Sequence, residues 1–176
     1  MPSHAIRILD AREARRRSAE LCEILIDCVE GGASVSFMLP MTHAKAERFW
    51  QSVADGVECG TRILLAALDP ESGRCVGTVQ VVHDLPENQP HRADVAKMLV
   101  HRCARRQGVG AALMQAAEEA ARAAGKTVLV LDTASAEAER LYERMGWQRV
   151  GRVPDYALLP AGGYCDTVFF YKQLAR

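Results

Sequence analysis

The chain has 176 residues, of which 22 are Lys or Arg and 22 are Asp or Glu, so its formal net charge is zero. This length fits one domain with a single substantial core, and we expect residues 1–176 to form one domain. A balanced charge excludes a general electrostatic attraction to nucleic acid or to an anionic membrane surface. Because no apolar run approaches the roughly 20 residues of a membrane span, we expect neither nucleic acid nor a membrane as a partner.

The cysteines and histidines are scattered along the chain. None of the six cysteines forms a C-x-x-C pair, and the N-terminus does not have the pattern of a signal peptide. We therefore expect reduced thiols in a cytoplasmic protein. The five histidines form no close pair with the spacing of metal ligands, so no metal site is expected.

Hydrophobic periodicity and turn residues predict a succession of strands and helices. In the first half we expect an edge strand at 5–9, a helix capped by Asp10 that ends at Gly31-Gly32, a helix at 42–57 capped by Thr42, and hairpin strands at 61–68 and 75–83. The second half predicts strands at 95–100, 127–133, 147–153 and 167–172, with helices at 109–124 and 135–145. This order predicts an α/β fold, a three-layer domain around a mixed sheet.

The turn that follows the apolar run 95–100 is the most informative segment. It reads Arg105-Arg106-Gln107-Gly108-Val109-Gly110-Ala111 and opens an alanine-rich helix. Apolar residues in that helix recur at steps of three or four, at Leu113, Ala116, Ala120 and Ala124. Glycines leave no side chain between an anion and the free N–H groups of the helix, whose dipole also attracts negative charge. Arg105 and Arg106 add positive charge, and a guanidinium group is able to form two parallel hydrogen bonds with phosphate oxygens. The segment therefore predicts a site for a phosphorylated cofactor.

The spacing of the glycines narrows the choice of cofactor. The turn has Leu113 in place of the third glycine of a dinucleotide-binding G-x-G-x-x-G motif, and it lacks the Gly-Lys-Ser/Thr of a nucleoside-triphosphate loop. Arg105-x-x-Gly108-x-Gly110 instead resembles the pyrophosphate loop of the GCN5-related N-acetyltransferases, the GNAT superfamily. A second segment, Ser135-x-x-Ala138-x-x-Leu141-Tyr142-x-x-x-Gly146-Trp147, is similar to the second hallmark of that superfamily. The resemblance runs from roughly Ile6 to the C-terminus.

This resemblance implies the GNAT fold, a mixed and mostly antiparallel central sheet flanked by helices, in which two parallel strands splay apart around the cofactor. The implied cofactor is acetyl-CoA (CoA). The residues implied to bind it are Met98, Leu99, Val100, Arg105, Arg106, Gln107, Gly108, Val109, Gly110, Ala111, Ser135 and Tyr142. Three of these depart from the superfamily pattern: Arg106 and Gln107 replace a usual Gly and Arg, and Ser135 replaces an asparagine that binds the pantetheine arm.

Acetyl transfer from a thioester to an amine has three chemical needs. The leaving thiolate needs a proton, the carbonyl oxygen needs a hydrogen-bond donor, and the amine must lose its proton before it attacks. The resemblance implies Tyr142 as the general acid and a backbone N–H at or near Leu99 as the donor to the oxygen. Asp94 and Asp132, at the ends of predicted strands, are the candidates for holding the ammonium group or passing its proton to water. The sequence leaves the distance between these two carboxylates open.

Within the superfamily, segments 29–38, 92–100 and 131–133 resemble the tabtoxin-resistance acetyltransferases, which acetylate a small amino-acid toxin that contains a β-lactam. In that likeness Asp94 stands where those enzymes carry a glutamate, whereas Asp132 and Tyr142 match their aspartate and tyrosine. The loop 31–37 joins the first two predicted helices, a region that lines the acceptor side in this superfamily. The implied acceptor-binding residues are Gly31, Gly32, Ser34, Phe37, Asp94 and Asp132.

These features predict an acetyl-CoA-dependent acyltransferase that acetylates the amine of a small molecule, such as an amino-acid-like toxin or antibiotic. Two alternatives stay open: an acetyltransferase for a protein or peptide amine, and a non-catalytic sensor that binds acyl-CoA. A thiol hydrolase built on Cys165 and Asp166 has no supporting motif. Homodimers are common in the superfamily, so the resemblance also admits a homodimer.

Overall fold

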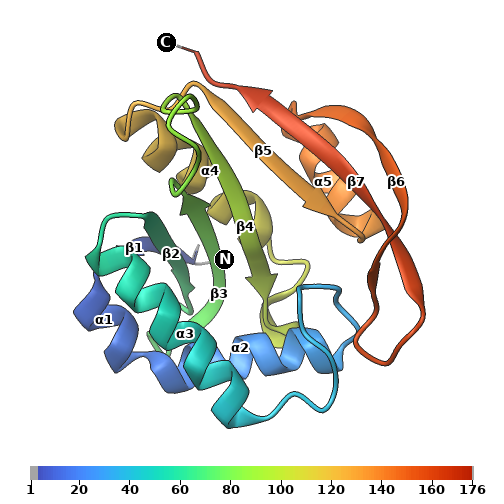
Figure 1. The fold of residues 1–176 in the computed structure, drawn as a ribbon. Helices are drawn as coiled ribbons and strands as arrows, with labels where there is room; N and C mark the ends of the chain where they lie inside the picture. The colour runs from blue at the N-terminus through green and yellow to red at the C-terminus, as the bar shows by residue number, and fades with distance from the viewer. Residues whose placement is uncertain (1–3, 176) are drawn as a thin grey trace.

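A twisted sheet between two layers of helices dominates the computed structural model, which describes residues 4–175 (Figure 1). The strand order is β1-β2-β3-β4-β5-β7-β6. The strands are β1 (Ala5–Leu9), β2 (Arg62–Leu68), β3 (Cys75–Val82), β4 (Arg92–Val100), β5 (Val128–Thr133), β6 (Gln148–Leu158) and β7 (Tyr164–Gln173). Neighbouring strands are antiparallel except β4 and β5, which are parallel. The predicted mixed, mostly antiparallel sheet is therefore confirmed.

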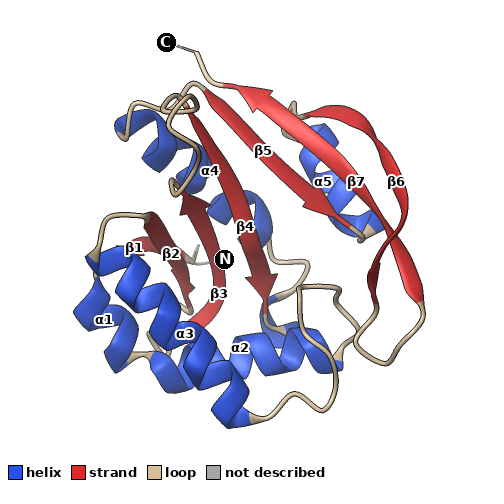
Figure 2. Cartoon of the chain, viewed as in Figure 1, coloured by secondary structure: helices blue, strands red, loops and turns tan. Residues whose placement is uncertain are grey.

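Helices cover both faces of this sheet (Figure 2). They are α1 (Ala11–Arg16), α2 (Ser18–Glu30), α3 (His43–Glu58), the 3-10 helix η1 (Arg102–Ala104), α4 (Val109–Ala123) and α5 (Ala136–Arg144). The first three pack together against one face, and α4 and α5 pack against the other. Within residues 4–175, no helix combines the length and the apolar composition needed to cross a membrane.

Strand β2 supplies side chains to the cores on both faces of the sheet. Leu64 and Ala66 pack with the α1–α3 layer, whereas Leu65 and Ala67 pack with the α4 side. Successive side chains of a strand point to opposite faces, so a strand that is covered on both sides is apolar at nearly every position. This is why β2 reads as a continuous apolar run in the sequence.

Strands β4 and β5 diverge shortly after they begin, and this divergence opens the sheet. Their parallel ladder runs only from Arg92–Val128 to Asp94–Val130. Beyond that point β5 stays paired with β7, as far as Thr133–Val168, while β4 continues without a partner on its β5 side (Figure 1). The backbone of β4 after Asp94 therefore has free hydrogen-bonding groups that face a gap in the sheet.

The prediction of one continuous helix after Asp10 is wrong. The chain forms two helices, α1 and α2, that are separated at Arg17, where φ is −94° and ψ is 12°. The Arg17 guanidinium donates to Glu20 Oε2 (3.0 Å) and to the carbonyl of Gly73 (3.1 Å). No glycine or proline stands at the break, so the local sequence gives no sign of it. The contact that accompanies the break is with Gly73 in the distant β2–β3 turn. The predicted caps are confirmed, since Asp10 accepts from the N–H of Glu13 and Thr42 from that of Lys45.

The buried side of α4 also differs from the predicted one. Leu113 and Ala120 are buried as expected, but Ala117 and Ala121 share that face, whereas Ala116 is half-buried and Ala124 is exposed. A helix with alanine at so many positions has little apolar periodicity from which its buried side can be inferred. The last two strands are longer than predicted, because β6 and β7 form a hairpin that extends past the edge of the core.

Glu118 connects α4 to the second sequence motif and leads to a stability prediction. Its carboxylate is 5% exposed, accepts from Trp147 Nε1 (3.0 Å) and pairs with the Lys172 ammonium (2.8 Å). Glu118→Gln removes the charge and leaves the half-buried Lys172 with the Met145 carbonyl but without its anionic partner, so we expect the free energy of unfolding to fall by about 3 kcal/mol. Urea unfolding measures this loss.

Glu119→Gln is the matched control for that measurement. Glu119 is the next residue of the same helix, but it is exposed and accepts only from Gln115 (3.1 Å). We expect its free energy of unfolding to change by less than about 0.5 kcal/mol. Equal losses in the two variants would contradict a specific role for the buried carboxylate.

Candidate active site

A cleft of about 910 Å³ opens where β4 and β5 diverge. One wall is β4 from Val95 to Val100 together with the turn that leads into α4, and the opposite wall is the end of β5 with α5. The loop 31–38 and residues of the β6–β7 hairpin line the remaining side. The cleft therefore joins the two motifs singled out in the sequence.

The N-terminus of α4 lines one end of the cleft and has free N–H donors. Gly108 caps the helix with φ 80°, and no side chain caps the helix in its place. The first helical hydrogen bond runs from the N–H of Ala112 to the carbonyl of Gly108 (3.1 Å), so the N–H groups of Val109, Gly110 and Ala111 have no partner within the helix. A Cβ at Gly108 would meet no atom within 4 Å, which shows that the space in front of these donors is open.

The polar side chains of this turn differ in where they lie. Arg105 lines the cleft, but its guanidinium donates to the carbonyl of Val100 (3.1 Å) and lies 3.5 Å from the buried carboxylate of Asp27. Part of its charge is therefore already compensated. Arg106 is exposed on the cleft wall with φ 61°, and Gln107 lies outside the lining because its amide donates to the carbonyl of Cys103 (2.9 Å). The structure does not bring Gln107 to the predicted cofactor site.

Tyr142 occupies the opposite wall of the cleft. Its side chain is only 5% exposed, and its ring packs against Trp147 and Phe170, with centroids 6.0 and 5.8 Å away. Burial raises the pKa of the phenol, and the nearby Asp132 carboxylate raises it further. The hydroxyl therefore keeps its proton at neutral pH and is able to donate it to a stronger base. Ser135, farther along this wall, caps α5 by accepting from the N–H of Ala138 (3.3 Å).

The two candidate carboxylates lie in different surroundings. Asp132 lines the cleft at the end of β5, where it accepts from the Thr167 hydroxyl (2.7 Å). Asp94 lies in the short paired part of β4, outside the cleft lining, and its carboxylate is paired with Arg92 (2.5 Å). The structure therefore brings Asp132, and not Asp94, to the cleft with Tyr142.

The backbone of β4 distinguishes Leu99 from its neighbours. The Leu99 carbonyl lies 3.1 Å from where a Cβ would stand on Gly77 of β3, and the N–H of His101 donates to Val76 of the same strand (2.9 Å). Leu99 and His101 thus face β3, and by alternation the backbone groups of Met98 and Val100 face the cleft. The predicted donor was a backbone N–H at or near Leu99. The N–H of Leu99 itself points toward β3, so the neighbouring N–H groups of Met98 and Val100 are the ones that face the cleft.

The loop 31–38 is attached to the β6–β7 hairpin. Ser34 Oγ lies 3.5 Å from the carbonyl of Leu158 and 3.4 Å from Cys165 Sγ, and the N–H of Leu39 donates to the carbonyl of Pro160 (2.9 Å). Phe37 packs edge-on against Phe49 of α3, with 5.2 Å between centroids. These contacts hold the loop against the hairpin. The predicted acceptor residues Gly31, Gly32, Ser34, Phe37 and Asp132 all line the cleft.

Sequence reasoning missed several polar residues of this cleft, among them Lys97, Ser36 and Arg144. Lys97 and Ser36 line it and contact each other, with Nζ and Oγ 3.1 Å apart. Lys97 is the only charged residue of the apolar run 95–100, which was a signal that this strand is not buried along its whole length. Ser36 carried no comparable signal in the sequence.

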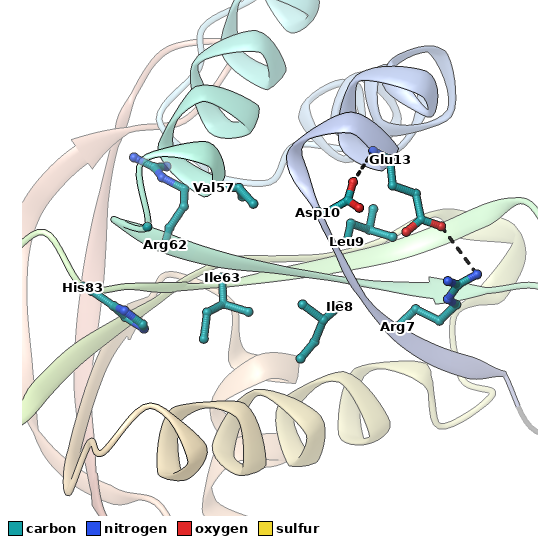
Figure 3. Close-up of a pocket in the computed structure, with 10 residues that line it drawn as sticks. Arg7, Ile8, Leu9, Asp10, Glu13, Val57, Arg62, Ile63 and His83 are labelled. Carbon is teal, nitrogen blue, oxygen red and sulfur yellow. Dashed lines mark hydrogen bonds and ion pairs between the residues drawn. The ribbon is translucent and has the colours of Figure 1, made fainter.

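A second, shallower hollow of about 540 Å³ lies beside the edge strand β1 (Figure 3). None of the predicted site residues line it, and several of its polar groups bind one another. Glu13 pairs with Arg7 (3.4 Å), and its N–H donates to Asp10 (2.6 Å). Within residues 4–175 no group of three or more His, Cys, Asp or Glu side chains is placed to hold a metal ion.

Solved acetyltransferases share this fold at low sequence identity. An acetyltransferase from Salmonella typhimurium, yncA, solved with its cofactor acetyl-CoA, superposes with a TM-score of 0.79 at 18% identity, covering 99% of this chain and 96% of that chain. A phosphinothricin acetyltransferase from Sinorhizobium meliloti, in complex with AcCoA, has a TM-score of 0.79 at 19% identity, covering 98% and 89% of the two chains. A ribosomal-protein-alanine N-acetyltransferase from Brucella melitensis has a TM-score of 0.75 at 22% identity, covering 97% and 99%. These likenesses establish the fold.

Sequence relatives identify the family. A curated relative from Azospirillum brasilense, an uncharacterized N-acetyltransferase in the hisH-hisA intergenic region, is 34% identical over 116 residues. That match covers 64% of this chain and 66% of the relative, slightly less than two thirds of its length. The model of the acetyltransferase (GNAT) domain matches residues 59–149, which is more than half of the chain and includes both motifs up to Trp147. The chain therefore belongs to the GNAT acetyltransferase family.

Proposed function

We propose that this protein is an acetyl-CoA-dependent N-acetyltransferase that acts on the amine of a small molecule. The observation that carries the proposal is the cleft, which brings the free N–H groups at the start of α4 together with Tyr142 and Asp132. The yncA structure contains acetyl-CoA, and the Azospirillum relative is named as an N-acetyltransferase, which supports the same cofactor and reaction.

The residues present fit this cofactor. The unpaired N–H groups of Val109, Gly110 and Ala111 suit a pyrophosphate, and Arg106 adds a positive charge beside them. The cleft-facing backbone of Met98 and the N–H of Val100 offer hydrogen bonds to an amide-containing arm such as pantetheine, whereas the Val100 carbonyl already accepts from Arg105. When bound, acetyl-CoA supplies the thioester carbonyl and a thiolate leaving group.

The chemistry then divides among three groups of this chain. Asp132 holds the acceptor's ammonium group and takes its proton or passes it to water. A backbone N–H of Met98 or Val100 donates to the carbonyl oxygen as negative charge develops there. Tyr142, whose raised pKa keeps the phenol protonated at neutral pH, donates its proton to the leaving sulfur.

The closed acceptor side supports a small acceptor. A protein or peptide amine needs an open groove, whereas here loop 31–38 is bound to the β6–β7 hairpin through Ser34 and through the adjoining Leu39. The Sinorhizobium neighbour is named for phosphinothricin, a small amino-acid-like compound, and the local likeness to tabtoxin-resistance enzymes points to the same class. We therefore favour an amino-acid-like toxin or antibiotic over a peptide.

The test is acetyl-CoA-dependent release of CoA against a panel of amines: tabtoxinine-β-lactam, phosphinothricin, free amino acids, polyamines, aminoglycosides and short peptides. Blanks without acceptor are needed because the exposed Cys59 and Cys103 react with thiol-detecting dyes. Saturable release with a small amine supports the proposal, and release with peptides alone supports the peptide alternative. Binding of CoA without turnover of any amine would favour the sensor.

Asp132→Asn tests the carboxylate. The amide oxygen still accepts from Thr167, so the geometry is kept, but the side chain no longer takes a proton or attracts an ammonium group. We expect kcat/KM to fall about 100-fold, and more for strongly basic amines than for weakly basic ones. Steady-state kinetics over amines of graded basicity measures the effect.

Asp94→Asn is the comparison for that experiment. Its carboxylate is paired with Arg92 outside the cleft lining, so we expect kcat/KM to stay within about threefold of the wild type. A larger loss from Asp94→Asn than from Asp132→Asn would reverse the assignment.

A further inference from the structure

Lys97 stands on the cleft wall where β4 leaves β5. Thr78 of β3 pairs with Leu99, and Gln80 pairs with Ala96, so β4 contains one residue more than β3 between these pairs. This is a β-bulge, and Lys97 adopts φ 51° within it. The Thr78 hydroxyl donates to the Lys97 carbonyl (3.3 Å). Bulges re-aim side chains next to active sites, and here the bulge gives the cleft a lysine.

The ammonium group of Lys97 contacts neutral groups of the acceptor side. Its Nζ lies 3.1 Å from Ser36 Oγ and 6.0 Å from the centroid of the Phe49 ring. Ser36 has φ 78°, so two of the four non-glycine residues with positive φ in residues 4–175 meet across the cleft. Such backbone conformations are costly and cluster at sites that bind or react.

The charge of Lys97 has no anionic partner in this arrangement. No carboxylate forms an ion pair with it in the part of the chain that the structure describes, 4–175. Asp132 is the nearby acid but already accepts from Thr167, and the Arg62 guanidinium is a second nearby cation. Burial lowers the pKa of Lys97, Asp132 raises it and Arg62 lowers it, with burial the largest influence. A half-buried cation without a counterion is unfavourable, and an anion delivered by a ligand removes that cost.

We propose that Lys97 binds a carboxylate of the acceptor, so that the acceptor is an amino-acid-like zwitterion and not a plain amine. The proposal rests on the proposed function, because it names the substrate class of the same cleft. Ser36 then donates to the same carboxylate, while the acceptor's amine faces Asp132 and Tyr142 on the opposite wall. The site thus recognises both charges of the acceptor: Lys97 on β4 binds its carboxylate, and Asp132 on β5 faces its ammonium group.

The surroundings favour the acceptor over the cofactor as the source of the anion. The groups suited to the cofactor's phosphates are the N–H donors of α4 and Arg106, in the turn and helix that follow the C-terminal end of β4. Lys97 instead contacts loop 31–38 through Ser36 and α3 through Phe49, which are elements of the acceptor side. An ammonium group beside a hydroxyl offers two donors to one carboxylate.

The experiment compares each common L-amino acid with its carboxamide as acceptor, in the wild type, Lys97→Met and Lys97→Arg. Methionine is unbranched at Cβ like lysine, so it suits the positive φ equally well, and arginine keeps the charge. In the wild type we expect the best acid to have a KM about tenfold below that of its carboxamide. Lys97→Met should raise the KM of the acid about tenfold and leave that of the carboxamide within about twofold. Lys97→Arg should retain the preference for the acid.

Four other results would overturn the proposal, and one of them concerns the function itself. A wild type that acetylates carboxamides or plain amines as well as acids leaves the acetyltransferase function standing but removes the zwitterion. Equal losses of kcat on acid and carboxamide in Lys97→Met would indicate a role in the reaction or the fold. A raised Kd for CoA in Lys97→Met would assign Lys97 to the cofactor's phosphates. No acetylation of any acceptor by the wild type would overturn the proposed function, on which this inference depends.

Discussion

Tyr142→Phe is expected to lower kcat about 100-fold while the Kd for acetyl-CoA stays within about twofold of the wild type. The substitution removes only the hydroxyl, and the ring continues to pack against Trp147 and Phe170. Without that hydroxyl the sulfur departs as an unprotonated thiolate, which raises the barrier of the transfer step. Because burial raises the pKa of Tyr142, the wild-type phenol stays protonated over the neutral range. The wild-type rate should therefore rise with pH as amines lose their protons, with no opposing loss from the tyrosine.

The measurement is steady-state kinetics with the best acceptor, combined with equilibrium binding of CoA. Tyr164→Phe is the control, because Tyr164 is 71% exposed at the start of β7 and does not line the cleft. It should behave as the wild type. If Tyr142→Phe retains full kcat, Tyr142 is a packing residue and the proton comes from elsewhere. If CoA binding is lost as well, the change has disturbed the cleft rather than the chemistry.

Gly108→Asp is expected to raise the Kd for CoA by at least about 100-fold. Gly108 is the N-cap of α4 and directly precedes the residues with free N–H groups. It has φ 80°, and the space where a Cβ would lie is open. An aspartate there places a negative charge against the pyrophosphate and accepts hydrogen bonds that the phosphates would otherwise receive. The same carboxylate caps α4, so the free protein should be destabilised little despite the unfavourable φ. Folding and cofactor binding are thus expected to respond very differently.

Gly108→Asn separates charge from shape. Asparagine has nearly the same size and tolerates positive φ, but it carries no charge. We expect its Kd for CoA to lie at least tenfold below that of Gly108→Asp, and the difference should shrink as salt is added. Equal Kd values for the two variants at low salt would mean that the pyrophosphate does not bind at this turn. Gly110 is a less suitable position, because a Cβ there would press on Leu141 of α5 (3.3 Å).

Much of the site could be predicted because its chemistry is local in sequence. The turn from Arg105 to Ala111 carries its own glycines and opens its own helix, so the free N–H groups at α4 follow from a few consecutive residues. The predicted caps Asp10 and Thr42 are equally local, and each accepts from an N–H three residues on. The resemblance to the GNAT superfamily placed Tyr142 on a helix beside the predicted cofactor loop, and the structure puts both on one cleft.

The parts that sequence reasoning missed depend on contacts between distant segments. The sequence predicts that Arg105 is free to bind phosphate. In the structure its guanidinium instead lies beside Asp27 of α2 and donates to the carbonyl of Val100. Gln107 looks like part of the same loop, but its amide turns back to Cys103. In both cases the competing partner comes from folding, and nothing in the motif itself indicates it.

By itself, the sequence determined the α/β fold class and, through its resemblance to the GNAT superfamily, singled out the helix that follows Gly108 and the residue Tyr142, because turn, cap and motif residues lie close together in the chain. Only the tertiary structure decided which carboxylate serves the cleft. Asp94 and Asp132 each lie near an end of their strand, and the early end of the β4–β5 ladder leaves one of them paired with Arg92 and the other at the opening. It also decided that Lys97 faces the cleft and contacts Ser36, because the bulge that turns Lys97 there results from the register between β3 and β4, a relation between strands that no single segment encodes.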